Sequence, residues 1–258
     1  MAPEQFYRLD GRVALIAGAS SGLGEGFARL LAAAGARVVL GARRLERVEA
    51  IAAELVAQGH EAMGVHLDVT DDASIIAAFD AAEARYGTAD TVIANAATGT
   101  GGRSTEAPVD GLRPTIATNF TAVYLVAREA ARRLIASGSR EKENGRILFT
   151  GSITALQHHT GDNAYAACKA AIAHLAKQFA KEWARQGINV NVIQPGWIRT
   201  PINDDWFASD RARQDIAGLP RRRMQEQSAL DDMVLYLCSD RSRQVTGSVF
   251  TLDDGQSL

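Results

Sequence analysis

The residues best suited to chemistry in this sequence are Tyr165 and Lys169, which stand four positions apart. On an α-helix this spacing places both side chains on one face, one turn apart. A phenol ordinarily titrates at a pKa of about 10, and an ammonium group held beside it favours the phenolate and lowers that pKa. The pair therefore predicts a proton donor or acceptor that works near neutral pH. A solvent-exposed pair on a helix surface is the alternative that the spacing leaves open.

A glycine-rich turn near the start of the sequence predicts a dinucleotide site. An apolar run at 12–17 precedes the turn, a helix closing at Gly35 follows it, and a second apolar run at 38–40 comes next. In such a strand–turn–helix unit, backbone N–H groups and the helix N-terminus can hold a pyrophosphate. The glycines, Gly18, Gly22 and Gly24, follow the spacing G-x3-G-x-G and not G-x-G-x-x-G. A flexible turn without a ligand is the alternative.

The residues after the second predicted strand bear on which dinucleotide binds. Dinucleotide sites often carry an acidic residue here that bonds to the adenosine ribose. This sequence has Ala42 followed by Arg43 and Arg44. Two cations that open a helix oppose its dipole, so we expect an anion beside them, and the 2′-phosphate of NADP fits. The alternative is a solvated arginine pair beside Glu46 and Glu49.

Polar residues also stand where other predicted strands end. Asp68 follows the strand at 62–67, Asn95 follows 91–94, and Ser152 follows 146–150. These carboxyl ends meet at the edge where open α/β sheets bind ligands, although Asp68 could equally cap the next helix. Asn119 falls on the apolar stripe of a long predicted helix at 111–137, three residues after Ile116 and four before Val123. A buried amide must be hydrogen-bonded, so Asn119 is either a structural amide or an anchor for a water molecule or a catalytic side chain.

The alternation of seven predicted strands with about six helices predicts a doubly wound α/β fold with a parallel sheet. No linker or repeat divides the 258 residues, so we expect a single domain over 1–258. A segment at about 196–225 lacks sustained periodicity and carries Trp197, Trp206 and Phe207. Long irregular segments of compact domains are usually functional, which predicts a lid or wall for an apolar substrate. Packing against a neighbouring subunit is the alternative.

Composition argues against several classes of partner. The net charge of −2 gives no basic excess for binding nucleic acid. No apolar run approaches the roughly 18 residues of a membrane span, and the first residues lack the pattern of a signal peptide. The two cysteines, Cys168 and Cys238, show neither metal-ligand spacing nor a disulfide framework. We therefore expect a cytoplasmic protein without a metal, nucleic-acid or membrane partner.

The order of these motifs resembles that of the short-chain dehydrogenase/reductase family over nearly the whole chain, with 3-oxoacyl-(acyl carrier protein) reductases and carbonyl reductases as the comparable members. The resemblance implies a Rossmann fold with a seven-stranded parallel sheet and the interconversion of a ketone and a secondary alcohol. Tyr165 would be the general acid in reduction and the base in oxidation. Lys169 would lower the pKa of Tyr165 and hold the nicotinamide ribose. Ser152 would bind the substrate oxygen, and Asn119 would hold a water molecule in a proton relay behind Lys169.

The same resemblance implies the cofactor contacts. Arg43 takes the place of the basic residue that marks NADP-preferring members, so NADP(H) is expected, with NAD(H) possible. Asp68 and Val69 match adenine contacts, and Asn95 matches the residue beneath a ribose. Tyr165 also counts among the cofactor contacts, with Lys169. The other expected contacts lie in the glycine turn and after the Pro195-Gly196 break: Gly18, Ser20, Ser21, Leu23, Gly24, Ile198 and Thr200.

Three departures from the family pattern accompany this resemblance. Ala17 stands where the family usually has Thr, and Ala94 and Ala97 interrupt its usual Asn-Asn-Ala-Gly run. These changes should alter local hydrogen bonding and not the chemistry. Ser21 is not the basic residue that some NADP-preferring members carry in the glycine loop, which leaves NAD(H) open.

The resemblance also implies partners and alternatives. The family usually forms tetramers or dimers through the helices of Asn119 and Tyr165 and the last strand, so we expect a homotetramer or homodimer that acts on a small carbonyl or alcohol substrate. The alternatives are an NAD(H)-dependent alcohol dehydrogenase of the same family, a non-redox epimerase or lyase on the same fold, and a dinucleotide-sensing protein without turnover. Loss of a catalytic side chain would mark the last of these, and none is lost.

Overall fold

The computed structural model describes residues 6–99, 101–158, 160–200, 207 and 210–258. Its strands form one parallel sheet in the order β3-β2-β1-β4-β5-β6-β7, which confirms the predicted doubly wound fold. The strands are β1 Val13–Ala17, β2 Arg37–Ala42, β3 Ala62–His66, β4 Thr91–Ala94, β5 Gly145–Thr150, β6 Ile188–Pro195 and β7 Val249–Leu252. The strand order reverses at β1, which lies between β2 and β4, and a reversal of this kind opens a crevice for ligands at the carboxyl ends of the strands.

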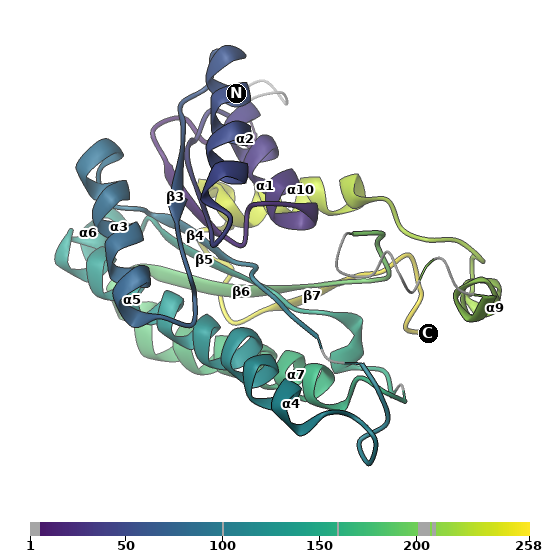
Figure 1. Ribbon diagram of the computed structural model, residues 1–258. Coiled ribbons are helices and arrows are strands. Elements are labelled where there is room, and N and C mark those ends of the chain that lie inside the picture. The colour runs from purple at the N-terminus through teal and green to yellow at the C-terminus, as the bar shows by residue number, and fades with distance from the viewer. Residues whose placement is uncertain (1–5, 100, 159, 201–206, 208–209) are drawn as a thin grey trace.

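Helices cover both faces of the sheet (Figure 1). One buried cluster joins the sheet to α1, α2 and α10, and the other joins it to α3, α5 and α7. The α-helices are α1 Gly22–Ala33, α2 Leu45–Ala57, α3 Asp72–Tyr86, α4 Val109–Ile116, α5 Ala122–Ala136, α6 Ser139–Lys142, α7 Asn163–Trp183, α9 Asp210–Gly218 and α10 Asp231–Cys238. Within the part of the chain that the structure describes, no helix has the length and apolarity needed to cross a membrane.

The central strands are apolar along their whole length because both of their faces are buried. In β1, Val13 and Leu15 pack in the cluster of α3, α5 and α7, whereas Ala14 and Ile16 pack in the cluster of α1, α2 and α10. This alternation follows from the two-residue period of a strand. Pairing of β1 with β4 then brings their carboxyl ends to the same level, so that the glycine turn after β1 meets the residues after β4.

The long helix predicted at 111–137 contains a wider turn. A π-helical turn at Ala117–Thr121 separates α4 from α5. Because this turn inserts an extra residue into the helical repeat, the two halves do not share one stripe. Val123 is buried, but Ile116 is 41% exposed, so the prediction that both lie on one buried face was wrong. Asn119 lies in the π-turn and is fully buried.

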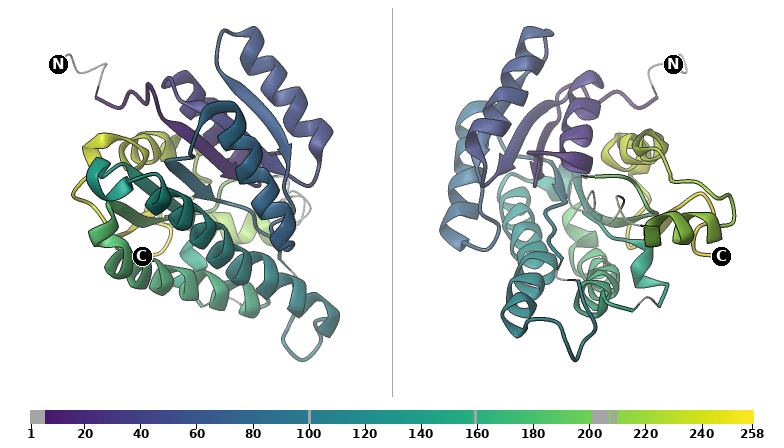
Figure 2. Two further views of the ribbon diagram at one scale, coloured as in Figure 1. Left: turned by 90° about the vertical axis from the view of Figure 1, so that its left-hand side faces the viewer. Right: turned by 45° about the vertical axis from the view of Figure 1, so that its right-hand side comes forward.

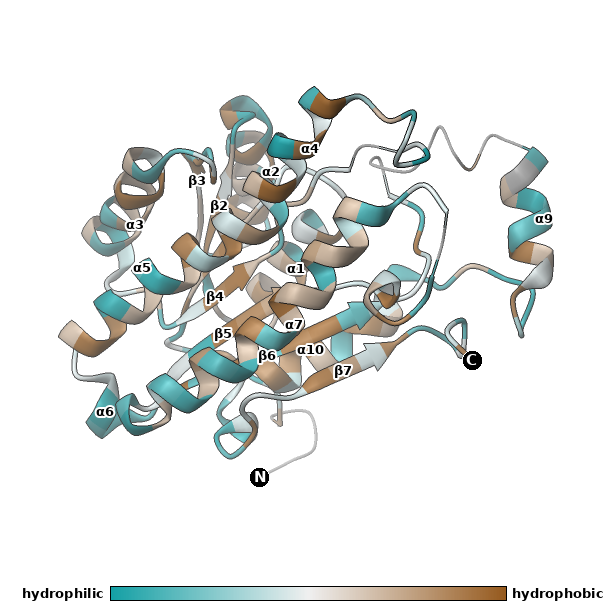
Figure 3. Cartoon of the chain, turned by 90° about the horizontal axis from the view of Figure 1, so that it is seen from below, coloured by the Kyte–Doolittle hydropathy of each residue, from teal (hydrophilic) through white to brown (hydrophobic). Residues whose placement is uncertain are grey.

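The segment at 196–225 contains a helix that the sequence did not predict. This helix, α9, stands outside the two helical layers (Figures 1 and 2). Its residues are mostly hydrophilic, whereas the strands are mostly hydrophobic (Figure 3). Helix α9 therefore lacks the apolar face that would have revealed it by periodicity. Trp206, which was predicted to line the substrate wall, lies outside the described residues.

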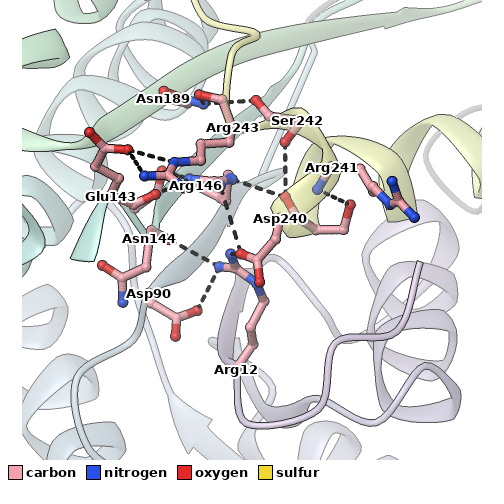
Figure 4. A network of polar contacts seen from close by, with 12 residues as sticks. Arg12, Asp90, Glu143, Asn144, Arg146, Asn189, Asp240, Arg241, Ser242 and Arg243 are labelled. Atoms are coloured by element: carbon pink, nitrogen blue, oxygen red, sulfur yellow. Dashed lines mark hydrogen bonds and ion pairs between the residues drawn. The ribbon is translucent and has the colours of Figure 1, made fainter. Parts of the chain in front are cut away.

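At the amino ends of the strands, two buried arginines join several elements (Figure 4). Arg12, before β1, donates to Asp90 Oδ1 at 3.2 Å and to the Asn144 carbonyl at 3.0 Å, and it forms an ion pair with Asp240. Arg146 of β5 is 2% exposed and donates to the Ser239 carbonyl at 3.0 Å. The network holds this edge of the sheet together and leaves the opposite, carboxyl edge to the predicted site.

Candidate active site

Tyr165, Ser152 and Lys169 come together at the carboxyl edge of the sheet. Ser152 follows β5, and the other two residues share one face of α7, as their spacing predicted. The side chain of Ser152 acts on the phenol of Tyr165 as a hydrogen-bonding neighbour that lowers its pKa. The Lys169 Nζ atom lies 5.3 Å from the centre of the Tyr165 ring. Three of the four predicted catalytic side chains therefore form one group.

Lys169 is enclosed by the protein, since its side chain is 1% exposed. Its ammonium group donates to the carbonyl oxygen of Thr150, the last residue of β5, at 2.7 Å. Burial disfavours the charged form and lowers the pKa of Lys169 to about 8. A lysine of this kind changes its charge close to physiological pH, unlike an exposed lysine.

Tyr165 has a pKa above that of an ordinary phenol. Its side chain is half-buried, and desolvation raises its pKa to about 12, against the lowering effect of the Ser152 hydrogen bond. The prediction that Lys169 lowers this pKa was wrong, because the ammonium group is bonded to Thr150 and desolvation dominates. Tyr165 is therefore a neutral phenol at physiological pH, which is the form that can donate a proton.

Asn119 connects the π-turn to the loop after β4. Its Nδ2 donates to the carbonyl oxygens of Thr98, at 2.5 Å, and Thr115, at 2.8 Å. Its buried Oδ1 has no hydrogen-bond partner among the described residues. The donor side thus acts as a structural amide, while the free acceptor leaves the role as an anchor for a water molecule as a prediction. π-Turns often occur at functional sites, where they reposition a side chain.

The glycine turn packs closely against the end of β4. A Cβ atom on Gly18, whose φ is +82°, would lie 2.7 Å from the Ala96 Cα, and one on Gly24 would lie 2.6 Å from the Asn95 Nδ2. Asn95 Nδ2 also donates to the Gly18 carbonyl at 3.2 Å. Ser21 is the cap residue of α1, and its side chain makes no capping hydrogen bond. Backbone N–H groups at this end are therefore available to an anion such as a pyrophosphate.

Of the two arginines after β2, Arg44 is the one that lies over the glycine turn. One of its Nη atoms donates to both Ser20 Oγ and Ser21 Oγ, each at 2.9 Å. Arg43 is exposed, and its charge contributes to lowering the pKa of Asp68. The sequence singled out both arginines but placed only Arg43 among the cofactor contacts. Adjacency in sequence could not tell which side chain turns back over the glycine turn.

Asp68 shapes the turn after β3. Its Oδ1 accepts the backbone N–H of Thr70 at 2.9 Å and the Thr70 hydroxyl at 2.7 Å, and these bonds lower its pKa. The residue that caps α3 is Asp71, which accepts the N–H of Ala73 at 3.0 Å. The capping alternative for Asp68 is therefore wrong, and its adenine contact stays a prediction. Val69 is buried and lines a small cavity with Ala17, Ala94 and Ala96.

The residues after β6 belong to the same edge of the sheet. Ile198 is 5% exposed and forms a backbone bridge with Gln225. Thr200 is partly buried and is the last residue described before a gap. The roles of Ile198, Thr200 and Leu23 as cofactor contacts remain predictions.

Comparison with known proteins decides the family. A family model described as enoyl-(acyl carrier protein) reductase matches residues 18–257. The chain is 34% identical over 251 residues to the 2,5-dichloro-2,5-cyclohexadiene-1,4-diol dehydrogenase LinX of Sphingobium indicum, covering 97% of this chain and 98% of that protein. The chain belongs to the short-chain dehydrogenase/reductase family.

Other members of the family resemble this one along their whole length. Cis-4-hydroxycyclohexanecarboxylate dehydrogenase of Sinomonas cyclohexanicum is 34% identical, with 95% of this chain and 96% of that protein covered. The crystal structure of a gluconate 5-dehydrogenase from Burkholderia cenocepacia in complex with NADP and tartrate is 30% identical, with a TM-score of 0.92 and 99% of both chains covered. This short-chain dehydrogenase/reductase is accordingly an oxidoreductase with a nicotinamide dinucleotide cofactor, and its glycine turn and the uncapped start of α1 fit such a cofactor.

Proposed function

We propose that this short-chain dehydrogenase/reductase interconverts a ketone and a secondary alcohol with NADP(H). The observation that carries the proposal is the grouping of the Tyr165 phenol with the buried Lys169, whose Nζ lies 5.3 Å from the centre of its ring, and with Ser152. A group of this kind can give a proton to a substrate oxygen. The bound cofactor supplies the hydride in reduction and accepts it in oxidation.

Each side chain has a separate task in this mechanism. The Ser152 hydroxyl orients the substrate oxygen by a hydrogen bond, and Tyr165 transfers its proton to that oxygen as negative charge develops there. The positive charge of Lys169, whose position is fixed by its bond to the Thr150 carbonyl, offsets part of the desolvation of the phenolate left behind, without bringing the pKa of Tyr165 below its ordinary value. In the direction of oxidation, the same phenolate takes the proton of the alcohol.

The preference for NADP(H) is proposed from the two arginines after β2. Arg44 is held over Ser20 and Ser21, and Arg43 lies at the same edge of the sheet, where a dinucleotide places its adenosine ribose. Guanidinium groups bind phosphate by charge-assisted hydrogen bonds. The gluconate 5-dehydrogenase with NADP bound supports this preference. An NAD(H)-dependent dehydrogenase is the alternative, because the charge of Arg43 already acts on the carboxylate of Asp68.

The substrate is proposed to be a small, mainly apolar alcohol or ketone on an alicyclic ring. Two relatives are named for such substrates, a cyclohexadiene-diol and a hydroxycyclohexanecarboxylate. The assembly is proposed to be a homotetramer or homodimer that uses α5 and α7, which run side by side (Figure 2). On these helices Tyr124 is 40% exposed and contacts Phe179, which stacks on Trp183.

The test is an assay with NADPH or NADH and a panel of cyclic and open-chain ketones. We expect consumption of NADPH with cyclic ketones, followed by the nicotinamide absorbance, and formation of the matching alcohol. Product without a net change in that absorbance would favour the epimerase or lyase alternative. Dinucleotide binding without turnover of any substrate would favour the sensor alternative.

A further inference from the structure

A turn at 253–258 follows β7 and contacts both the loop after β5 and the segment after β6. Asp253 holds the turn together, since its carboxylate accepts the N–H groups of Gly255 at 3.0 Å and Ser257 at 2.7 Å. Gln256 is 4% exposed, although it lies in an irregular segment close to the surface. Burying the side-chain amide of Gln256 costs free energy, because the amide loses its hydrogen bonds with water.

Gln256 bonds to two segments that are far apart in sequence. Its Oε1 accepts the backbone N–H of Trp197 at 2.6 Å, and its own carbonyl oxygen accepts Nε2 of Gln157 at 2.6 Å. Gln157 lies in the loop that begins at Ser152, and Trp197 begins the irregular segment after β6. The backbone of Gly196 approaches so closely that a Cβ there would lie 2.6 Å from the Gln256 Oε1.

The far end of the same irregular segment returns to this turn. Gln225 donates its N–H to the Trp197 carbonyl at 3.0 Å, and its Oε1 accepts the N–H of Gly196 at 3.2 Å. Arg223 Nε lies 2.7 Å from Asp254 Oδ2, and Arg221 Nε lies 3.3 Å from Asp254 Oδ1. Both stems of the segment, Gly196–Thr200 and Leu219–Gln225, are therefore fastened to the 253–258 turn.

The backbone at this junction is strained on both sides. Among the described residues, three that are not glycine have a left-handed φ, and two of them are Arg222 at +51° and Asp254 at +54°. Such conformations cost free energy and are kept where the surroundings enforce them, often at functional sites. Here the enforcing contacts are the ion pairs of Asp254 with Arg221 and Arg223.

We propose that the 253–258 turn, which we call the clasp, holds the segments around the substrate site in fixed positions, with Gln256 as its positioning residue. It fixes the two stems of the 196–225 segment relative to each other and to the loop that carries Ser152. The proposal rests on the proposed function in one respect, that these stems and this loop border the substrate. Gln256 should contribute more than Asp254 to holding the stems, because the bond from the Trp197 N–H to its Oε1 is buried. The arginines that meet Asp254 are more than 60% exposed, and exposed ion pairs contribute little.

The experiment compares Gln256→Met, which keeps the length of the side chain but removes the Oε1 acceptor of the Trp197 N–H, with Leu258→Ala, which changes the fully exposed neighbour in the same turn. We expect Gln256→Met to raise the KM for the ketone by about fivefold, the cost of one lost hydrogen bond, with kcat and the Kd for NADPH within twofold of the parent. Trypsin should cut at Arg199 and Arg213 faster by about the same factor. Leu258→Ala should change none of these values.

Two results would overturn the clasp. One is an unchanged KM and an unchanged cleavage rate in Gln256→Met. The other is a lower melting temperature with faster cleavage along the whole chain, which a merely structural role would give. If Gln256→Met does not fold, Asp254→Asn is the test variant and Arg222→Ala is its control. The Arg222 side chain makes no ion pair with Asp254 among the described residues. We expect faster cleavage at Arg199 and Arg213 only in Asp254→Asn, and only at low salt, and equal rates in both variants would contradict the clasp.

The cleavage assay separates this proposal from the proposed function. It needs no turnover, so it tests the clasp even if the parent protein reduces no ketone. A parent without ketone reductase activity would refute the proposed function alone, and cleavage of Gln256→Met at the parent rate would refute the clasp alone.

Discussion

Burial acts in opposite directions on the two titrating residues of the site. It raises the pKa of the Tyr165 phenol to about 12 and lowers that of the Lys169 ammonium to about 8, because in each case it disfavours the charged form. At pH 7 the Tyr165 phenol is therefore neutral, whereas Lys169, with a pKa of about 8, is still mostly protonated.

The first prediction concerns the proton donor. Tyr165→Phe removes the hydroxyl and keeps the ring, so we expect kcat for ketone reduction to fall by about 10³-fold, with the Kd for NADPH within about twofold of the parent. Stopped-flow turnover and fluorescence titration measure the two quantities. Tyr86→Phe, at the end of α3, is the matched control. Full turnover by Tyr165→Phe would refute the role of this phenol.

The second prediction concerns pH and Lys169. Its pKa of about 8 in the folded protein lies below the ordinary value for lysine, so between the two values only the unfolded chain holds the proton. The free energy of unfolding should therefore rise with pH from about 8 to about 10 in the parent. Lys169→Met should lack this rise. Urea denaturation of both proteins across this range measures it, and parallel curves would contradict the low pKa.

The third prediction concerns the phosphate of the cofactor. Arg44→Ala should raise the Kd for NADPH by about tenfold, the contribution of a charge-assisted hydrogen bond, and leave the Kd for NADH nearly unchanged. Arg43→Ala should act in the same direction. Arg47→Ala, one turn further along α2, is the control. Isothermal titration measures each affinity, and equal losses for both dinucleotides would exclude a phosphate contact.

At the scale of elements, the features that could be predicted from the sequence are those that a short stretch of residues specifies by itself. The strands and the glycine turn were recognised because apolar runs of four to six residues and closely spaced glycines are signals within a short window. The π-turn was missed because an extra residue in a helix leaves both flanking patterns apolar. The contacts of Gln256 with Gln157 and Trp197 could not be predicted, since they join positions 99 and 59 residues away through the fold.

The fourth prediction belongs to the junction of β1, α1 and β4. Gly24→Ala should place a Cβ against Asn95 Nδ2 and the Gly18 carbonyl. We expect a loss of about 1–3 kcal/mol in unfolding free energy, as for other overpacked sites, and weaker binding of NADPH and NADH alike. Gly218→Ala, where a Cβ would meet nothing within 4 Å, is the control. A Gly24→Ala protein with parental affinity for both dinucleotides would contradict the close packing of the turn.

At the scale of the whole molecule, the two edges of the sheet have different tasks. The carboxyl edge carries the predicted chemistry, and the amino edge carries the network of Arg12 and Arg146 (Figure 4). The buried guanidinium of Arg146, whose pKa is lowered to about 10 mainly by burial, depends on nearby carboxylates for compensation. A change at the amino edge should therefore alter stability without altering the reaction.

The fifth prediction tests this separation. Asp90→Ala removes the carboxylate that accepts from Arg12 at 3.2 Å and leaves a buried guanidinium with less compensation. We expect a loss of about 3 kcal/mol in unfolding free energy, with kcat and KM of the folded fraction unchanged. Glu61→Ala, an exposed acid before β3, is the control. A change in KM as large as the change in stability would show that the two edges are coupled.

The π-turn at Ala117–Thr121 makes this protein sensitive to deletion of a single residue. Each residue of a helix rotates the next by about 100°, so losing a single codon in this turn would restore a regular helix and swing everything on one side of it by that angle. Asn119 would then face away from Thr98, or α4 would leave its place beside α7. Point substitutions in α4 and α5 change one side chain at a time, but an in-frame deletion here would separate the loop after β4 from the site in one step.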